Sequence, residues 1–281
     1  MGQSPYGAVL QVEIKAKPLD GGPHINAGIL SADQMTALKE VSVSQGIMLE
    51  SGSARLAAPG GPHYGSPDKD PAIRLANIEL AGQLKVPFTT GILVGIGETR
   101  KERIESFFAL RELHERYEHI QEIIVQPFRP KPGTLMADHI GADDDELKWS
   151  IAVARIIFGP EMSIQAPPKL SPDSEAELIA AGINDFGGVS PVTPDHVNPE
   201  APWPQLAVLK NHAEQASKEL VARLPIYPKY MAVDSGWVSS SIADNLVQHS
   251  DASGMARSDN CLLYTSDAAD DTPCVDLGGR R

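Results

Sequence analysis

The feature that most constrains the fold is a repeated alternation of strand-like and helix-like segments. Six short apolar or β-branched runs, near residues 25, 43, 88, 122, 163 and 184, are each followed by a helix or a loop. Repeated βα units form a parallel sheet with helices outside, because the crossover connections are right-handed. The sequence therefore predicts an α/β fold, either a closed eightfold barrel or an open doubly wound sheet. Six strands after an irregular start favour a partial TIM-type barrel that lacks its first two strands.

Several of these elements carry recognisable end signals. Ser31 precedes an apolar-periodic segment as an N-cap, and Asp70 with Pro71 begins a second helix over 71–84. The segment 86–97, VPFTTGILVGIG, is a continuous apolar run, which is typical of a strand buried on both faces of a parallel sheet.

We expect four regions along the chain. Residues 1–23 form a ragged start of uncertain origin, 24–200 a partial barrel, and 201–260 a helical extension with an amphipathic helix over 203–224. Residues 261–281 break the hydrophobic periodicity and resemble a translated sequencing adapter. We expect this tail to be disordered and to carry no chemistry.

Composition and charge exclude several functions. The net charge of -13, with scattered Lys and Arg, argues against a nucleic-acid partner. No run of about 18 apolar residues and no signal-peptide pattern occur, so we expect no membrane partner and a cytoplasmic location. The sequence has no H-E-x-x-H motif, no P-loop and no Ser/His/Asp triad that we can assemble. The two cysteines, Cys261 and Cys274, lie in the adapter-like tail and are not expected to bind a metal.

The candidate site lies at the carboxyl ends of the strands, where barrels of this kind place their chemistry. Polar groups or glycines end five of the six strands: Glu50 and Ser51; Gly95, Gly97 and Glu98; Gln126 and Arg129; Gln165; Asn184 and Asp185. Each of them alone could be a cap or a loop residue, as Glu98 would be at a helix start. Their convergence on one rim favours a site.

Three loop features add to this rim. His63 could be a base, a metal ligand or a substrate contact, or simply a solvated loop histidine. The segment 187–204 carries five prolines and suits a lid over the barrel mouth, with Asp195, His196 and Asn198 as its polar face. The segment 91–98, GILVGIGE, lacks the G-x-G-x-x-G spacing of a dinucleotide fingerprint, whereas its glycines would let the backbone approach an adenine or ribose closely.

Several long strings then carry a resemblance to a known family. They are MLES, HYGSPDKDPAIRLA, PFTTGILVGIGETRKERI, HIQEIIVQPFRPKPGT, IQAPP and GINDFGGVSPVTPDHVNPEAPWP. From about His24 to about Asn260 the chain resembles the radical S-adenosylmethionine (SAM) subunit of FO synthase, a 7,8-didemethyl-8-hydroxy-5-deazariboflavin synthase. The resemblance implies a lyase that uses SAM and a 4Fe-4S cluster to close the deazaflavin ring of a tyrosine–ribitylaminouracil adduct. It also implies a companion subunit or a fused second domain that supplies this adduct.

The resemblance also assigns roles to individual residues. Glu50 resembles the acid that meets the methionyl or ribose end of SAM, and Arg74 the arginine that pairs with the SAM carboxylate. Gly95, Ile96, Gly97 and Glu98 resemble the adenine-side motif. The residues implied to face the substrate are His63, Gln126, Arg129, Gln165 and Asp185.

The chain departs from the family pattern at three places. The CxxxCxxC loop that holds the cluster is absent, and Pro127 and Pro130 stand where Asn and Ala are usual. Pro127 removes a backbone donor beside Gln126. We expect the chain to be a fragment of a gene that continues upstream to the CxxxCxxC motif, and we expect the fragment to bind no cluster and to be inactive.

Two alternatives stay open. A cluster-free protein could act as a binding partner, although an open barrel would expose strand edges that invite aggregation. A non-radical barrel lyase could use Glu50 or Asp185 as its base. The sequence leaves open whether the parent protein is a stand-alone subunit or half of a fused synthase.

Overall fold

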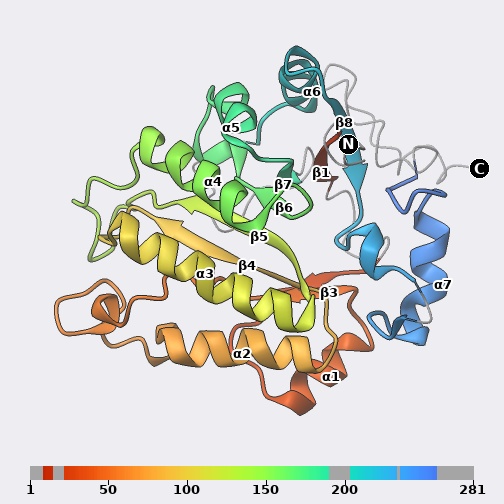
Figure 1. The fold of residues 1–281 in the computed structure, drawn as a ribbon, viewed down its shortest axis with the longest axis horizontal. Helices are drawn as coiled ribbons and strands as arrows, with labels where there is room; N and C mark the ends of the chain where they lie inside the picture. The colour runs from red at the N-terminus through yellow and green to blue at the C-terminus, as the bar shows by residue number, and fades with distance from the viewer. Residues whose placement is uncertain (1–8, 15–21, 190–202, 233–234, 258–281) are drawn as a thin grey trace, which may run out of the picture.

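Eight parallel strands form one sheet in the computed structural model of the chain, in the order β2-β3-β4-β5-β6-β7-β1-β8 (Figure 1). The structure describes residues 9–14, 22–189, 203–232 and 235–257. The strands are β1 (Val9–Ile14), β2 (His24–Ile25), β3 (Ser44–Gly46), β4 (Phe88–Val94), β5 (Ile120–Pro127), β6 (Ser163–Gln165), β7 (Asp185–Val189) and β8 (Glu219–Arg223). All the pairings between strands of this sheet are parallel, which confirms the predicted α/β architecture.

Helices follow the strands and cover the outer face of the sheet. Figure 1 shows α2, α3 and α4 lying side by side over the sheet. The longer helices are α1 (Ala32–Lys39), α2 (Pro71–Gln83), α3 (Arg100–Tyr117), α4 (Asp144–Phe158), α5 (Glu175–Ala181), α6 (Leu206–Gln215) and α7 (Ser240–His249). Four 3-10 turns are η1 (Ala54–Ala57), η2 (Pro67–Lys69), η3 (Pro168–Leu170) and η4 (Pro228–Tyr230). In the described part of the chain, no helix is long and apolar enough to cross a membrane.

The predicted helix starts are present. Ser31 forms a capping box with Gln34, and the Asp70 side chain accepts a hydrogen bond from the backbone of Ala72, with Pro71 in the first turn of α2. These caps satisfy backbone N–H groups that have no partner inside the helix.

The sheet curves into a partial barrel. Arg223 at the end of β8 contacts Glu122 on β5, although three other strands lie between β8 and β5 in the sheet. Only a strongly curved sheet brings these side chains together. Among the described residues β8 and β2 do not pair, so the barrel is partial, as the sequence predicts.

Two hydrophobic cores hold this barrel. The larger one lies between the sheet and the outer helices and includes Phe88, Ile123 and Phe107, which are all nearly or fully buried. The smaller one is built from the chain after β8 and includes Leu224, Ile226, Tyr227, Tyr230, Val238 and Leu246, with Val43 from the loop before β3.

The segment after β8 covers the amino-terminal end of the barrel. The Tyr230 hydroxyl donates to the backbone oxygens of Glu118 and Ile120, at 2.8 and 3.2 Å, where β5 begins. The Pro225 oxygen accepts from Ser44 at the start of β3. This capping segment, residues 224–232 and 235–257, covers the amino-terminal mouth of the barrel and leaves the carboxyl-end mouth for chemistry.

The structure also corrects two expectations. The start of the chain, interpreted as a ragged beginning of uncertain origin, contributes β1, which pairs with β7 and β8. The helix predicted over 203–224 ends at Gln215, because Ser217 takes a left-handed conformation with φ 56° and the following residues join the sheet as β8. The proposed lid residues Asp195, His196 and Asn198, and the tail with Cys261 and Cys274, lie outside the described residues.

Candidate functional site

Glu50 lies at the rim in a constrained backbone conformation. It follows β3 and bridges to Ile92 of β4, with φ 60° in the left-handed region that side chains seldom adopt. Its N–H donates to the Gly91 oxygen at 3.1 Å, and its oxygen accepts from the Leu93 N–H at 2.8 Å. The strand beside it therefore holds Glu50 in place.

The Glu50 carboxylate is the centre of a charged cluster that we name the Glu50 cluster. Its oxygens lie 2.9 Å from Arg74 Nη1, 2.9 Å from His63 Nε2 and 3.1 Å from Lys69 Nζ. Burial alone would raise the pKa of Glu50, but the hydrogen bond from His63 and the charges of Arg74 and Lys69 outweigh it and lower the pKa to about 2. The structure thus brings together three predicted site residues, Glu50, His63 and Arg74.

The Glu50 cluster fixes the loop between β3 and α2. Arg74 is almost buried and also donates to the backbone oxygens of Met48 and Asp68. Arg74 and Lys69 both face Glu50, and Arg74 also lies 3.9 Å from the Asp68 carboxylate. Lys69 is partly exposed at 36%, so its ammonium is a cation of the cluster that a ligand can reach from the rim. A carboxylate with so low a pKa is a weak base at neutral pH, which disfavours a lyase that uses Glu50 as its base.

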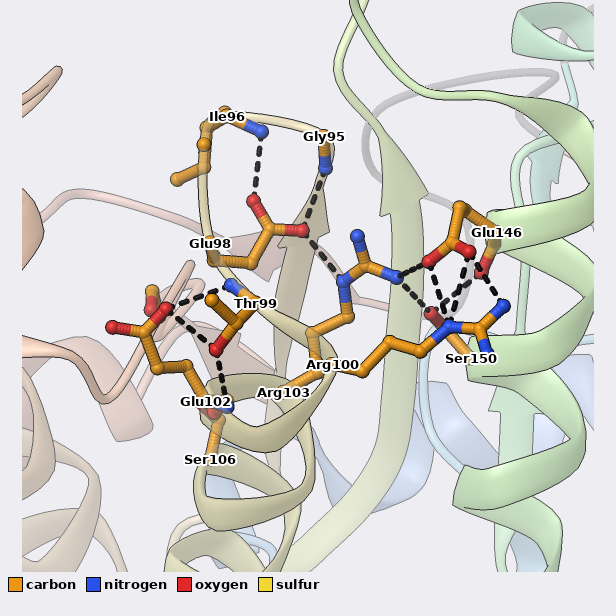
Figure 2. A network of polar contacts seen from close by, with 12 residues as sticks. Gly95, Ile96, Glu98, Thr99, Arg100, Glu102, Arg103, Ser106, Glu146 and Ser150 are labelled. Atoms are coloured by element: carbon orange, nitrogen blue, oxygen red, sulfur yellow. Dashed lines mark hydrogen bonds and ion pairs between the residues drawn. The ribbon is translucent and has the colours of Figure 1, made fainter.

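The loop after β4 is held in shape by Glu98. One oxygen of Glu98 accepts from the backbone N–H of Gly95 at 2.7 Å and from Arg103 Nε at 2.6 Å, and the other accepts from the N–H of Ile96 at 2.8 Å (Figure 2). The Glu98 side chain is only 2% exposed. Arg103 continues the network to Glu146 at 2.5 Å. Glu98 therefore acts on the loop rather than presenting its own charge to solvent.

The exposed point of this loop is Gly97. Its φ is 104°, and a Cβ placed there would meet no atom within 4 Å. Its oxygen accepts a hydrogen bond from Arg55 at 2.8 Å, and Arg55 is held in turn by Glu102. The hydrogen bond from Arg55 helps to hold the pKa of Glu102 well below its usual range. The result is a rigid backbone turn with an open face at the carboxyl end of β4.

A second buried network lies inside the barrel, and we name it the floor network. Asp185 at the start of β7 is fully buried, with its oxygens 2.6 Å from Arg223 Nε and 2.7 Å from the Tyr227 hydroxyl. Glu122 of β5 lies 3.0 Å from Arg223 Nη2 and 3.2 Å from the Tyr227 hydroxyl. Burial raises the pKa of Tyr227, so this hydroxyl stays protonated. Asp185 is thus occupied by protein partners.

The remaining predicted residues lie between the floor network and the rim. Gln165 of β6 is 8% exposed and pairs in register with Asp185, and a Cβ on Gly187 would come within 1.8 Å of its Nε2. Gln126 and Arg129 line one pocket of about 320 Å³ at the end of β5. Arg129 is engaged by the backbone oxygens of Leu170 and Ala142 and by Asp144 and Ser171.

Sequence reasoning missed Lys69 and three members of the floor network: Glu122, Arg223 and Tyr227. A charged residue inside the apolar run IQEIIVQPF was a usable signal for Glu122. Arg223 was hidden because its segment was expected to be helical. Among the described residues, no group of three or more His, Cys, Asp or Glu side chains is arranged to hold a metal ion.

Solved structures with this fold come from two kinds of protein. The hydrogenase maturase HydG of Carboxydothermus hydrogenoformans aligns with a TM-score of 0.57 at 14% identity, covering 80% of this chain and 50% of that one. Methylornithine synthase aligns with a TM-score of 0.57 at 16% identity, covering 71% of this chain and 58% of that one. No family model matches the chain.

The partial parallel barrel shares its fold with these solved structures, which defines the chain as an α/β barrel protein. The 7,8-didemethyl-8-hydroxy-5-deazariboflavin synthase of Methanopyrus kandleri is 46% identical over 235 residues, which are 84% of this chain and 70% of that protein. The chain belongs to this deazaflavin synthase family.

Longer relatives match over the same region. The FO synthase of Streptomyces avermitilis is 49% identical over 239 residues, and that of Mycobacterium tuberculosis is 47% identical over 262 residues. The matches cover 84% and 91% of this chain but only 28% and 31% of those proteins. The chain therefore spans less than a third of the length of these FO synthases.

Proposed function

We propose that the chain is the SAM- and substrate-binding part of a radical SAM lyase. The reaction closes the ring of 7,8-didemethyl-8-hydroxy-5-deazariboflavin from a tyrosine–ribitylaminouracil adduct. The observation that carries this proposal is the identity of 46–49% to deazaflavin and FO synthases over a region that includes both rim features, the Glu50 cluster and the Gly95–Glu98 loop.

The described residues fit SAM at two places. Gly95, Ile96, Gly97 and Glu98 would hold the adenosine part, since the turn is rigid and its face at Gly97 is open. Glu50 and Arg74 would hold the methionyl or ribose part, where the partly exposed ammonium of Lys69 suits a carboxylate. When bound at a reduced cluster, SAM supplies the carbon radical that starts the chemistry.

The described residues do not fit a 4Fe-4S cluster. Such a cluster with one open iron needs three cysteine thiolates, and the part of the chain that the structure describes contains none. Cys261 and Cys274 lie outside it. The cluster used by the family therefore has no ligands among the described residues.

The proposal includes a partner. A companion subunit or a fused second domain supplies the adduct, and the barrel mouth opposite the capping segment receives it. We assign five residues to the substrate side: His63, Gln126, Arg129, Gln165 and Asp185. Gln126 lines the pocket at the mouth directly. Arg129 and Asp185 would position their protein partners, the Ala142 backbone and Arg223, around the substrate.

A chimaeric enzyme tests the proposed function. Residues 24–257 of this chain replace the matching part of the Methanopyrus kandleri synthase, which keeps its own remaining residues. We expect the chimaera to form fluorescent deazaflavin in the presence of SAM, reductant and adduct. Arg74→Gln should abolish the product, whereas Arg111→Gln, which removes an exposed helix ion pair with Glu115, should not. A folded chimaera with a reconstituted cluster that forms no deazaflavin would contradict the proposal.

A further inference from the structure

The pocket at the end of β5 has the size and walls of a small-molecule site. Its volume of about 320 Å³ lies at the lower end of the range of roughly 300–1,000 Å³ for such sites. Leu93, Phe128, Met136 and Leu170 form apolar walls, Gln126 lies at the strand end, and Lys131 and Thr134 add polar groups. The guanidinium of Arg129 is held by four protein oxygens. Apolar walls with a few polar groups suit a flat ring that carries hydrogen-bonding groups at its edge.

Gln126 has a free amide in this pocket. The side chain of Gln126 is half-buried, yet it makes no hydrogen bond to any residue that the structure describes. A glutamine amide offers one acceptor and two donors side by side. This arrangement matches the edge of a cyclic amide, whose N–H donates to Oε1 while its carbonyl accepts from Nε2.

Leu135 is exposed in a way that a ligand would explain. It lines the same pocket, yet its side chain is fully exposed to solvent. It lies on a loop over 128–142 whose base is closed by the bond from the Ala142 N–H to the Phe128 oxygen and by Arg129 on the Ala142 oxygen. A loop pinned at its base places Leu135 at a fixed edge of the pocket, where a bound ring would cover its apolar surface.

We propose that this pocket binds the pyrimidinedione ring of the deazaflavin substrate and product, with Gln126 pairing to the ring's amide edge and Leu135 covering its face. The inference rests on the proposed function, because that function supplies a ligand with such a ring. Gln126 would then be a specificity residue: it would favour a ring that carries an N–H between two carbonyls over a ring that lacks this N–H. A phenol ring has no such amide edge and would not pair with Oε1 and Nε2 of Gln126 side by side.

The test measures binding by the fluorescence of the deazaflavin product itself, with the chain as it is. A second probe is the same compound methylated at the ring nitrogen of the amide edge, which loses that donor. We expect Gln126→Leu to weaken binding of the product by about tenfold or more, as expected when two buried hydrogen bonds are lost. We expect Leu135→Ala to weaken it less, by about three- to tenfold.

The methylated probe separates direct pairing from a general effect. It should bind the unmodified chain about as weakly as the product binds Gln126→Leu, and Gln126→Leu should not distinguish the two probes. Gln83→Leu, the same replacement at an exposed position at the end of α2, is the matched control and should bind like the unmodified chain.

Two outcomes would overturn the inference and are distinguishable. If the chain binds the product but neither Gln126→Leu nor methylation changes the affinity, the ring lies elsewhere and the proposed function still stands. If the chain does not bind the product at all up to millimolar concentration, both the subsite and the proposed function lose their support. Circular dichroism spectra of all variants confirm that they are folded.

Discussion

Two buried carboxylates at the rim, Glu50 and Glu98, are each paired with an arginine, and each uses this pairing to shape a loop. Glu50 joins Arg74 of α2 to the end of β3, and Glu98 joins Arg103 of α3 to the turn after β4. Removing one partner of such a pair leaves an uncompensated buried charge, which costs far more than the pair contributes as a whole. The shape of the rim therefore depends on charge pairs between strands and outer helices.

The sequence shows which residues are candidates for such pairs better than it shows which residue each of them contacts. Glu50, Arg74 and Glu98 can be found because they follow apolar runs at strand ends or begin helices. The pairing of Asp185 with Arg223 cannot be read from spacing, since the two residues are 38 positions apart and meet only because the sheet curves. Contacts across the interior of a barrel depend on closure, which no local pattern encodes.

His119 carries a pH dependence of stability. It is fully buried, with its ring near those of Phe88 and Tyr117, and burial, with a smaller effect from His114, lowers its pKa to about 4. The unfolded chain gains this proton below about pH 6.5, whereas the folded chain resists it until about pH 4. Stability should therefore fall by about 3 kcal/mol as the pH falls through this window, and should be unaffected by His119 above it.

Urea denaturation between pH 4 and 8 measures this effect. His119→Leu should lower the number of protons taken up on unfolding in this pH range by about one. His114, whose pKa burial also lowers to about 4, should still take up a second proton on unfolding. His249→Leu, at a more exposed position at the end of α7, is the control for replacing a histidine by leucine. An unchanged profile in His119→Leu would show that this ring does not resist protonation.

At the scale of elements, β4 combines a buried strand and an open turn in one run, GILVGIG. The strand half lies so close to β5 that a Cβ on Gly91 would come within 1.9 Å of the Ile124 oxygen. The turn half ends at Gly97, where a Cβ would have free space. Glycine is therefore needed for two different reasons: at Gly91 because β5 leaves no room for a side chain, and at Gly97 because the turn requires a positive φ.

Two alanine substitutions separate these roles. Gly91→Ala should cost at least about 3 kcal/mol or prevent folding, because β4 and β5 would have to separate. Gly97→Ala should cost about 1–2 kcal/mol, from backbone strain alone. Urea denaturation followed by circular dichroism compares the two, and equal losses would contradict the packing at Gly91.

The alternation of strands and helices was enough to predict six strands of the sheet, β2 to β7, but not β1 or β8. The run ELVAR in β8 alternates polar and apolar residues, yet it also extends the helical pattern of α6. What decides between the two is pairing with β1, where Gln11 lies opposite Val221. A local pattern cannot show whether a distant partner strand is present.

At the scale of the whole molecule, the described part of the barrel offers no ligands for the iron–sulfur cluster that the proposed reaction needs. The full sequence has two cysteines, and three thiolates are needed to hold the family's cluster. Anaerobic reconstitution of this chain with iron and sulfide should therefore give no stoichiometric 4Fe-4S absorption and no cleavage of SAM. Four irons per chain after gel filtration would refute this expectation.

The capping segment has a consequence for the order of events during synthesis. Ser241 donates to the backbone oxygen of Glu40, and Lys39 donates to that of Gly236, across 201 and 197 positions of the chain. At roughly 5–20 residues per second, the partners of α1 leave the ribosome about 10–40 seconds after α1 itself. Throughout that interval the contacts that join the capping segment to α1 cannot form, and the amino-terminal end of the barrel lacks its cover. The floor of this barrel is the last part to be closed.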